Sequence, residues 1–90
     1  MSTSTLEVHV VAADREVWAG EANMVVARTS EGELGVLPGH EPFLGVLAAA
    51  GEVRIHTADN GVIVANAEGG FLSVEHNTVM VVARQAALAE

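Results

Sequence analysis

The chain has 90 residues and a mass of 9.3 kDa, enough for one small domain and too little for two. Half of its residues are hydrophobic, which gives it the apolar content for a core and excludes a disordered segment. Four arginines and no lysine stand against 12 acidic residues, so the net charge of −8 argues against binding to nucleic acid or anionic lipid through phosphate groups, and the absence of cysteine excludes disulfides and thiolate metal sites.

Membrane-spanning and export signals are not expected. The longest stretch without a charge, residues 42–51, is far shorter than the roughly 20 apolar residues of a membrane-spanning helix. The N-terminus has neither the positive charge nor the apolar run of a signal peptide. We therefore expect a chain that stays in the cytosol.

The N-terminal half has the alternation of short β-strands. Leu6, Val8 and Val10 alternate with polar residues, which predicts a strand near residues 4–12. The following segments are predicted in chain order to be a turn at 14–15, a short extended piece at 16–19, a β-branched strand at 23–29 and an ordered loop at 33–42 that contains the Pro38-Gly39 turn.

The C-terminal half predicts two β-hairpins. Residues 43–50 fit a buried strand and a short helical turn equally well. The first hairpin consists of residues 51–57 and 62–65, which are separated by residues typical of a turn. The second consists of residues 70–75 and 78–82 around the turn at His76-Asn77. Residues 68–70 link the two hairpins.

The residue types at the C-terminus no longer favour a strand, because residues 84–90 are strong helix formers without a β-branched side chain. The sequence thus predicts a sandwich domain at 1–84 and the start of a C-terminal helix at 85–90. The fold class is all-β, a flattened sandwich or roll of about eight to ten short strands with a short helical start at the C-terminus.

No motif for catalysis is present. The four histidines lack metal-binding spacing, and neither a serine nucleophile elbow nor a phosphate-binding glycine loop occurs. We therefore expect no catalytic residue, no metal and no cofactor. The segment from Ser30 to His40 instead combines three glycines, a proline and two acids, which favours a shaped loop that presents side chains to a partner.

That segment also carries a family resemblance. EGELGVLPGHEPFLGVL resembles the signature of the ε-subunit family of bacterial F-type ATP synthases, the counterpart of the mitochondrial δ subunit. The opening LEVHVVAADREVWAGEANMVVART is similar to the family's first three strands, and EGGFLSV is similar to its later Gly-Gly turn. The resemblance covers about residues 5–84 in the family's order.

The resemblance implies a non-catalytic rotor part at the foot of the central stalk. It implies that the sandwich links the γ subunit to the membrane c-ring, touches the catalytic head only indirectly, and couples ion-driven rotation to ATP synthesis. It further implies a peripheral place at the cytoplasmic face of the bacterial plasma membrane, held through the complex only, with no nucleic acid and no small-molecule substrate as partner.

The resemblance also assigns interface roles to residues. It implies a c-ring-facing loop made of Glu31, Gly32, Glu33, Leu34 and Gly35, and a γ or stalk contact made of Pro38, Gly39 and His40. A rotor part further needs an apolar contact patch, for which the candidates, each equally compatible with the core, are Met24, Val26, Val36 and Leu37. Family members usually continue into a helical hairpin that inhibits ATP hydrolysis or binds ATP; because this sequence ends at Glu90, the resemblance does not bring those functions to it.

Two other functions remain open from the residues alone. The chain could be a free-standing small β-barrel metal-binding module or enzyme that uses His40 with Glu31, Glu33 or His76 around a metal. A nucleic-acid-binding barrel ranks last, because it needs basic residues and exposed aromatic platforms that three aromatics and a charge of −8 do not supply.

Overall fold

The computed structural model describes residues 5–49 and 51–89, and all regular structure in these ranges is β. The strands are β1 (Leu6–Ala12), β2 (Arg15–Thr29), β3 (Gly32–Val36), β4 (Phe43–Val46), β5 (Gly51–Thr57), β6 (Val62–Glu68), β7 (Phe71–Glu75), β8 (Thr78–Val82) and β9 (Gln85–Leu88). The all-β prediction is confirmed.

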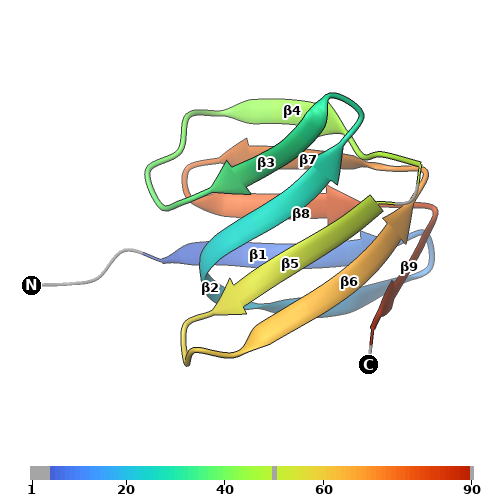
Figure 1. Ribbon diagram of the computed structural model, residues 1–90. Coiled ribbons are helices and arrows are strands. Elements are labelled where there is room, and N and C mark those ends of the chain that lie inside the picture. The colour runs from blue at the N-terminus through green and yellow to red at the C-terminus, as the bar shows by residue number, and fades with distance from the viewer. Residues whose placement is uncertain (1–4, 50, 90) are drawn as a thin grey trace, which may run out of the picture.

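Strand β2 connects two layers of the sandwich. Its first part pairs with β1, whereas its last part lies between β3 and β5. One layer, named here the β1 layer, is therefore β4-β7-β8-β1 with the start of β2. The other, the β5 layer, is β3, the end of β2, β5, β6 and β9. Figure 1 shows β5 and β6 crossing in front of β1.

Strand β2 is longer than predicted. The sequence predicted two separate extended pieces, at residues 16–19 and 23–29. The two pieces are one continuous strand of 15 residues. A register irregularity between Ala22 and Met24 lies where the pairing passes from β1 to β5. The break that the sequence indicated is therefore a bulge at the change of layer rather than an end of the strand.

The core lies between the layers and follows the period of two along the strands. Leu6, Val8 and Val10 of β1 and Val53 and Ile55 of β5 are fully buried side chains of one cluster. The remaining members of the core are Ala22, Val25, Ala27, Val36, Leu47, Ala65, Ala67, Leu72, Val74, Val79, Val81 and Ala83. Burial of this apolar surface is the main favourable term for folding.

The structure forms strands in two segments where the sequence did not predict one: residues 33–42, predicted as a loop, and residues 43–50, left open between a strand and a helical turn. The predicted loop 33–42 begins with β3, because Val36 pairs with Val25 and enters the core while Gly35 lies on the outer face. In the ambiguous segment 43–50, residues 43–46 form β4, which pairs with β7; residue 50 lies outside the described residues.

The predicted helical start at 85–90 is wrong for residues 85–88, which form β9. This strand pairs antiparallel with β6, from Glu68 opposite Gln85 to Ala65 opposite Leu88. The N–H of Ala89 also donates to the carbonyl of Val64 at 2.7 Å. Helix propensity is a weak preference that tertiary pairing overrides, and the open edge of β6 supplies partners for the backbone of these residues. Glu90 and the first four residues lie outside the described residues.

Both predicted hairpins are confirmed. The β7–β8 hairpin closes through His76 and Asn77, whose φ angles of 53° and 61° are those of a type I′ turn. The link between the hairpins needs glycine at position 70, because a Cβ there would collide with the carbonyl oxygen of Val82. This close approach explains the second glycine of the Gly-Gly pair.

Candidate interaction surfaces

The acidic turn between β2 and β3 is built around Thr29, the one buried polar residue among those the structure describes. Its hydroxyl donates to the carbonyl of Gly32 at 2.7 Å and accepts from the N–H of Glu31 at 3.2 Å. Gly32 has a φ of 125°, a conformation that other residues rarely adopt. The backbone of the turn is thus fixed, and it presents the exposed side chain of Glu31.

The two glutamates of this segment have different surroundings. Glu33 lies opposite Arg28 in the β2–β3 pair, with a guanidinium-to-carboxylate distance of 3.8 Å. Glu31 is absent from the ion pairs of the described residues. Leu34 packs against the core and Gly35 faces outward, so Glu31 is the residue of the predicted set that stands at the turn itself.

The predicted stalk contact forms a second tight turn. The N–H of His40 donates to the carbonyl of Leu37 at 3.0 Å, and Gly39 has a φ of 89°. Proline at the second position and a positive φ at the third define a type II turn, as the Pro38-Gly39 pair predicted. The structure does not bring this turn next to the acidic one, because the two lie at opposite ends of β3 (Figure 1).

Asn77 holds the second turn in place, a contact that the sequence prediction of a turn at His76-Asn77 did not include. Its side-chain Oδ1 accepts a hydrogen bond from the N–H of Gly39 at 2.7 Å, across 38 residues of sequence. Its own carbonyl accepts from the N–H of Glu7 at 2.8 Å. The β7–β8 turn therefore positions the Pro38-Gly39-His40 turn.

An apolar surface lies on the outside of the β1 layer, at the end of β4 where the carbonyl of Val46 accepts a hydrogen bond from the N–H of Ser30 at 2.9 Å. Leu44, Val46 and Phe71 have exposed fractions of 72%, 61% and 44%, and Val46 lies directly opposite Phe71. The apolar row continues onto β8, where Val82 pairs with Phe71. We call this surface, made of Leu44, Val46, Phe71 and Val82, the β4–β7 face. An apolar patch of this kind on a small protein is typical of a binding surface.

The apolar candidates from the sequence are distributed differently. Val36 is fully buried in the core, whereas Leu37 is exposed. Met24 and Val26 are half-buried and alternate with the buried Val25 on β2. None of the four contributes to the β4–β7 face. Sequence reasoning did not predict this face, because residues 43–50, which contain β4, fitted a strand and a helical turn equally well.

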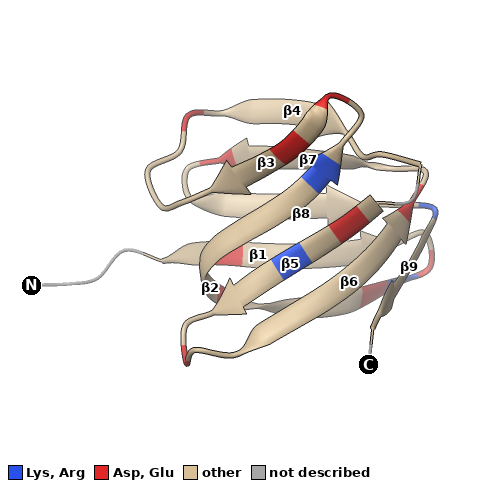
Figure 2. Ribbon diagram, in the orientation of Figure 1, with Lys and Arg blue, Asp and Glu red and all other residues tan. Residues whose placement is uncertain are grey.

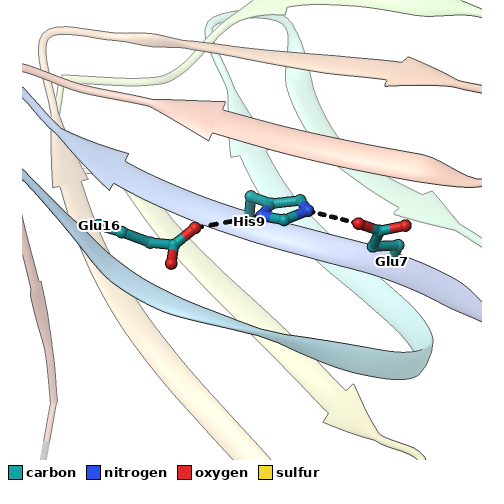
Figure 3. Close-up of polar contacts among 3 residues, drawn as sticks. All are labelled: Glu7, His9 and Glu16. Atoms are coloured by element: carbon teal, nitrogen blue, oxygen red, sulfur yellow. Dashed lines mark hydrogen bonds and ion pairs between the residues drawn. The ribbon is translucent and has the colours of Figure 1, made fainter.

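A charged cluster lies on β1 and β2 and consists of Glu7, His9 and Glu16 (Figure 3). The ring of His9 lies between two carboxylates, with Nε2 at 2.8 Å from Glu7 and Nδ1 at 3.2 Å from Glu16. Hydrogen bonds to Glu7 and then Glu16 raise the pKa of His9 above its ordinary value of 6.5. The strand neighbours of His9, Ala19 and Met80, carry no charge, so these two glutamates dominate its surroundings.

The metal-binding alternative finds no site in the described part of the chain. Within residues 5–49 and 51–89, no three histidine or acidic side chains lie close enough to hold one ion. His40 instead places its Nδ1 at 2.7 Å from the carbonyl of Glu41. Acidic residues are spread over the strands and turns (Figure 2). The described residues also contain no helix long and apolar enough to cross a membrane.

Sequence comparison identifies close relatives over nearly the whole chain. Residues 5–89 match the family described as "ATP synthase, Delta/Epsilon chain, beta-sandwich domain". The chain is 53% identical over 85 residues to the ATP synthase epsilon chain of Streptomyces coelicolor, covering 94% of this chain and 68% of that one. It is 51% identical over 83 residues to the ATP synthase epsilon chain of Frankia casuarinae, covering 92% and 96%.

Structural comparison shows the same fold at low sequence identity. A chain in the cryo-EM structure of the Euglena gracilis mitochondrial ATP synthase, with OSCP, F1 and c-ring, matches with a TM-score of 0.87 at 22% identity. The match covers 98% of this chain and 56% of the Euglena chain. A chain of the Tetrahymena thermophila central stalk and c-ring matches with a TM-score of 0.68 at 18% identity, covering 96% and 68%.

Proposed function

The chain belongs to the delta/epsilon family of ATP synthase, and we propose that its sandwich joins the γ subunit to the c-ring and so transmits ion-driven rotation to the catalytic head. It is a non-catalytic subunit of the central stalk, and it associates with the membrane as part of the ATP synthase complex. The finer location that we propose is the cytoplasmic face of the bacterial plasma membrane.

The observation that carries the proposal is the β4–β7 face. Leu44 and Val46 lie on an edge strand with most of their surface exposed, and Phe71 extends the patch onto the next strand. Removing such apolar surface from water is favourable and supplies a driving force for association. The Pro38-Gly39-His40 turn lies shortly before β4, which runs from Phe43 to Val46, so a γ subunit that lies along β4 contacts both the turn and the apolar face.

We assign the acidic turn, which lies at the other end of β3 from the Pro38-Gly39-His40 turn, to a different partner. We assign Glu31 as its main contact with the polar loops of the c-ring. An exposed ion pair of this kind contributes typically less than about 1 kcal/mol, so its role is orientation more than affinity. Glu33 contributes less charge because Arg28 lies opposite it.

Torque transfer requires that the two contacts do not move relative to each other. Each turn is fixed by its own hydrogen bonds, through Thr29 at one end and Asn77 at the other. Both turns flank β3, which is paired along its length with β2. The sandwich can therefore act as a rigid coupling element in which no bond is made or broken.

A capture experiment tests this proposal. The purified chain is immobilised and exposed to the γ subunit of the same ATP synthase, comparing the unmodified chain with Val46→Asp and with the control Val62→Asp. Val62 is 54% exposed on the other layer, so the control adds the same charge at a similarly exposed strand position. We expect Val46→Asp to weaken γ binding by tenfold or more and Val62→Asp to leave it unchanged. Equal binding by all three proteins would overturn the assignment of the β4–β7 face.

A further inference from the structure

The β4–β7 face continues across the rest of the β1 layer. Residues that lie opposite each other in neighbouring strands point to the same side of a sheet. One row on the outside therefore crosses β4, β7, β8 and β1, and its members are Val46, Phe71, Val82 and Val11. Val82 and Val11 are half-buried, whereas Val46 and Phe71 are exposed. Apolar surface thus extends from β4 as far as β1.

A second row lies beside the first and ends in a histidine. It consists of Leu44, Ser73, Met80 and His9, again one residue from each of the same strands. Neighbouring strands are about 4.8 Å apart, so His9 lies roughly 15 Å from Leu44 along this row. A stable interface covers about 800 Å² of each partner, which is a patch about 30 Å across. A γ subunit centred on Leu44 and Phe71 therefore reaches His9.

The charged groups around His9 are carboxylates. Glu7 and Glu16 flank its ring at 2.8 Å and 3.2 Å (Figure 3). Glu21 lies opposite Glu7 on β2 and adds a third carboxylate. Strand β8, on the other side of β1, contributes the uncharged residues Thr78, Met80 and Val82. The side chain of His9 has an exposed fraction of 26%, so in the free chain it exchanges protons with water.

The protonation state of His9 changes the free energy needed to cover this cluster. When His9 is neutral, a partner that covers it removes the negative charges of Glu7 and Glu16 from water without compensation, which is unfavourable. When His9 is protonated, it forms ion pairs with both carboxylates and cancels one of the two charges. Covering therefore favours the protonated form, and by thermodynamic linkage the protonated form favours covering.

On the basis of the γ contact assigned above, we propose that the γ-binding surface extends from the β4–β7 face across β8 to β1, where protonation of His9 strengthens the binding of γ. Hydrogen bonds to Glu7 and Glu16 already raise the pKa of His9 in the free chain, and removal of water by γ raises that pKa further. The affinity for γ is highest below the raised pKa of His9 and falls as the pH rises through it. Acidic conditions thus tighten the contact, and alkaline conditions loosen it.

Calorimetry of γ binding at pH 6.0 and pH 8.5 tests this proposal. The 90-residue chain is titrated into the γ subunit of the same ATP synthase at constant ionic strength. We expect the unmodified chain to bind about three- to tenfold more tightly at pH 6.0, because each unit by which γ raises the pKa of His9 is worth tenfold. His9→Gln should lose this difference. The matched control is His56→Gln, which changes a half-buried strand histidine on the outside of the β5 layer and should keep it. His40 is present in all three proteins, so a difference between the two variants belongs to His9.

A second variant keeps the histidine and removes its carboxylates. With Glu7→Gln combined with Glu16→Gln, neutral His9 no longer leaves negative charge under γ, so the tighter binding at pH 6.0 should be lost or reversed. Circular dichroism confirms that each variant is folded. The same pH dependence in the unmodified chain and in His9→Gln would overturn the role of His9 while leaving the γ contact in place. Absence of γ binding by the unmodified chain at both pH values would overturn the γ contact itself, and the role of His9 with it.

Discussion

The side chain of Asn77 accepts a hydrogen bond from the backbone N–H of Gly39 at 2.7 Å. This bond joins the β7–β8 turn to the Pro38-Gly39-His40 turn, so the segment proposed to contact γ is positioned by a hairpin far away in sequence. Asn77 also has a φ of 61°, which asparagine tolerates better than most residues. One residue therefore shapes its own turn and holds a second one.

Substitutions at Asn77 separate these two roles. Asn77→Gly keeps the positive φ but loses the acceptor, and it should lower the free energy of unfolding by about 1 kcal/mol. Asn77→Ala loses the acceptor and also strains the backbone, and it should lower the free energy by about 2 to 3 kcal/mol. Urea unfolding followed by circular dichroism measures both. The account is contradicted if alanine is tolerated as well as glycine.

Replacement by alanine should reduce the stability of the fold strongly at Gly70 and only slightly at Gly35. A Cβ at Gly70 would meet the backbone of Val82 and Ala83, which cannot move without disturbing β8, so Gly70→Ala should destabilise the fold by about 3 kcal/mol or more. Gly35 has no atom within 4 Å of the corresponding position, and Gly35→Ala should change stability by less than about 1 kcal/mol. Thermal or urea unfolding of the two variants makes the comparison, and similar losses in both would contradict it.

The His9 cluster predicts a pH-dependent contribution to stability. Because Glu7 and Glu16 raise the pKa of His9 in the folded state, protonated His9 stabilises the fold. This contribution is fully present below pH 6.5, the ordinary pKa, and is lost as the pH rises through the raised pKa. The difference in unfolding free energy between the unmodified chain and His9→Gln should therefore be larger at pH 5.5 than at pH 8.5. A difference that does not vary with pH would show that the cluster is not formed in solution.

Charge reversal at the acidic turn should affect binding without affecting folding. Glu31→Arg changes an exposed residue that makes no ion pair within the described chain, so the free energy of unfolding should change by less than about 0.5 kcal/mol. Capture of the purified c-ring should weaken, most clearly at low salt. Glu68→Arg, an exposed reversal on β6, is the matched control. Loss of c-ring capture in both variants would indicate a general charge effect in place of a contact at Glu31.

Local chemistry accounts for the parts of the fold that sequence reasoning predicted correctly. Alternation along β1 and β5, the residues of the two hairpin turns and the Pro38-Gly39 pair each act within a few residues, so their signals are visible in the sequence. The β3 strand and β9 were missed because their pairing partners decide their structure. Residues 85–88 have high helix propensity, yet the open edge of β6 makes them a strand.

The candidate interaction surfaces were predictable only in part. The acidic and Pro-Gly turns could be located from sequence, but their separation at opposite ends of β3 depends on the structure. The β4–β7 face arises because two strands distant in sequence pair side by side, which places Val46 opposite Phe71. Contacts of this kind leave no periodic signal in a single sequence.

Ion-driven ATP synthesis in membrane vesicles tests the central claim most directly. Complexes are assembled with the unmodified chain, with Val46→Asp, or without the chain, and both ATP synthesis and ATP hydrolysis are measured. If the chain couples rotation without taking part in catalysis, synthesis should be lost or strongly reduced without the chain and with Val46→Asp, while the catalytic head still hydrolyses ATP. Full ion-driven synthesis by complexes that lack the chain would contradict the account.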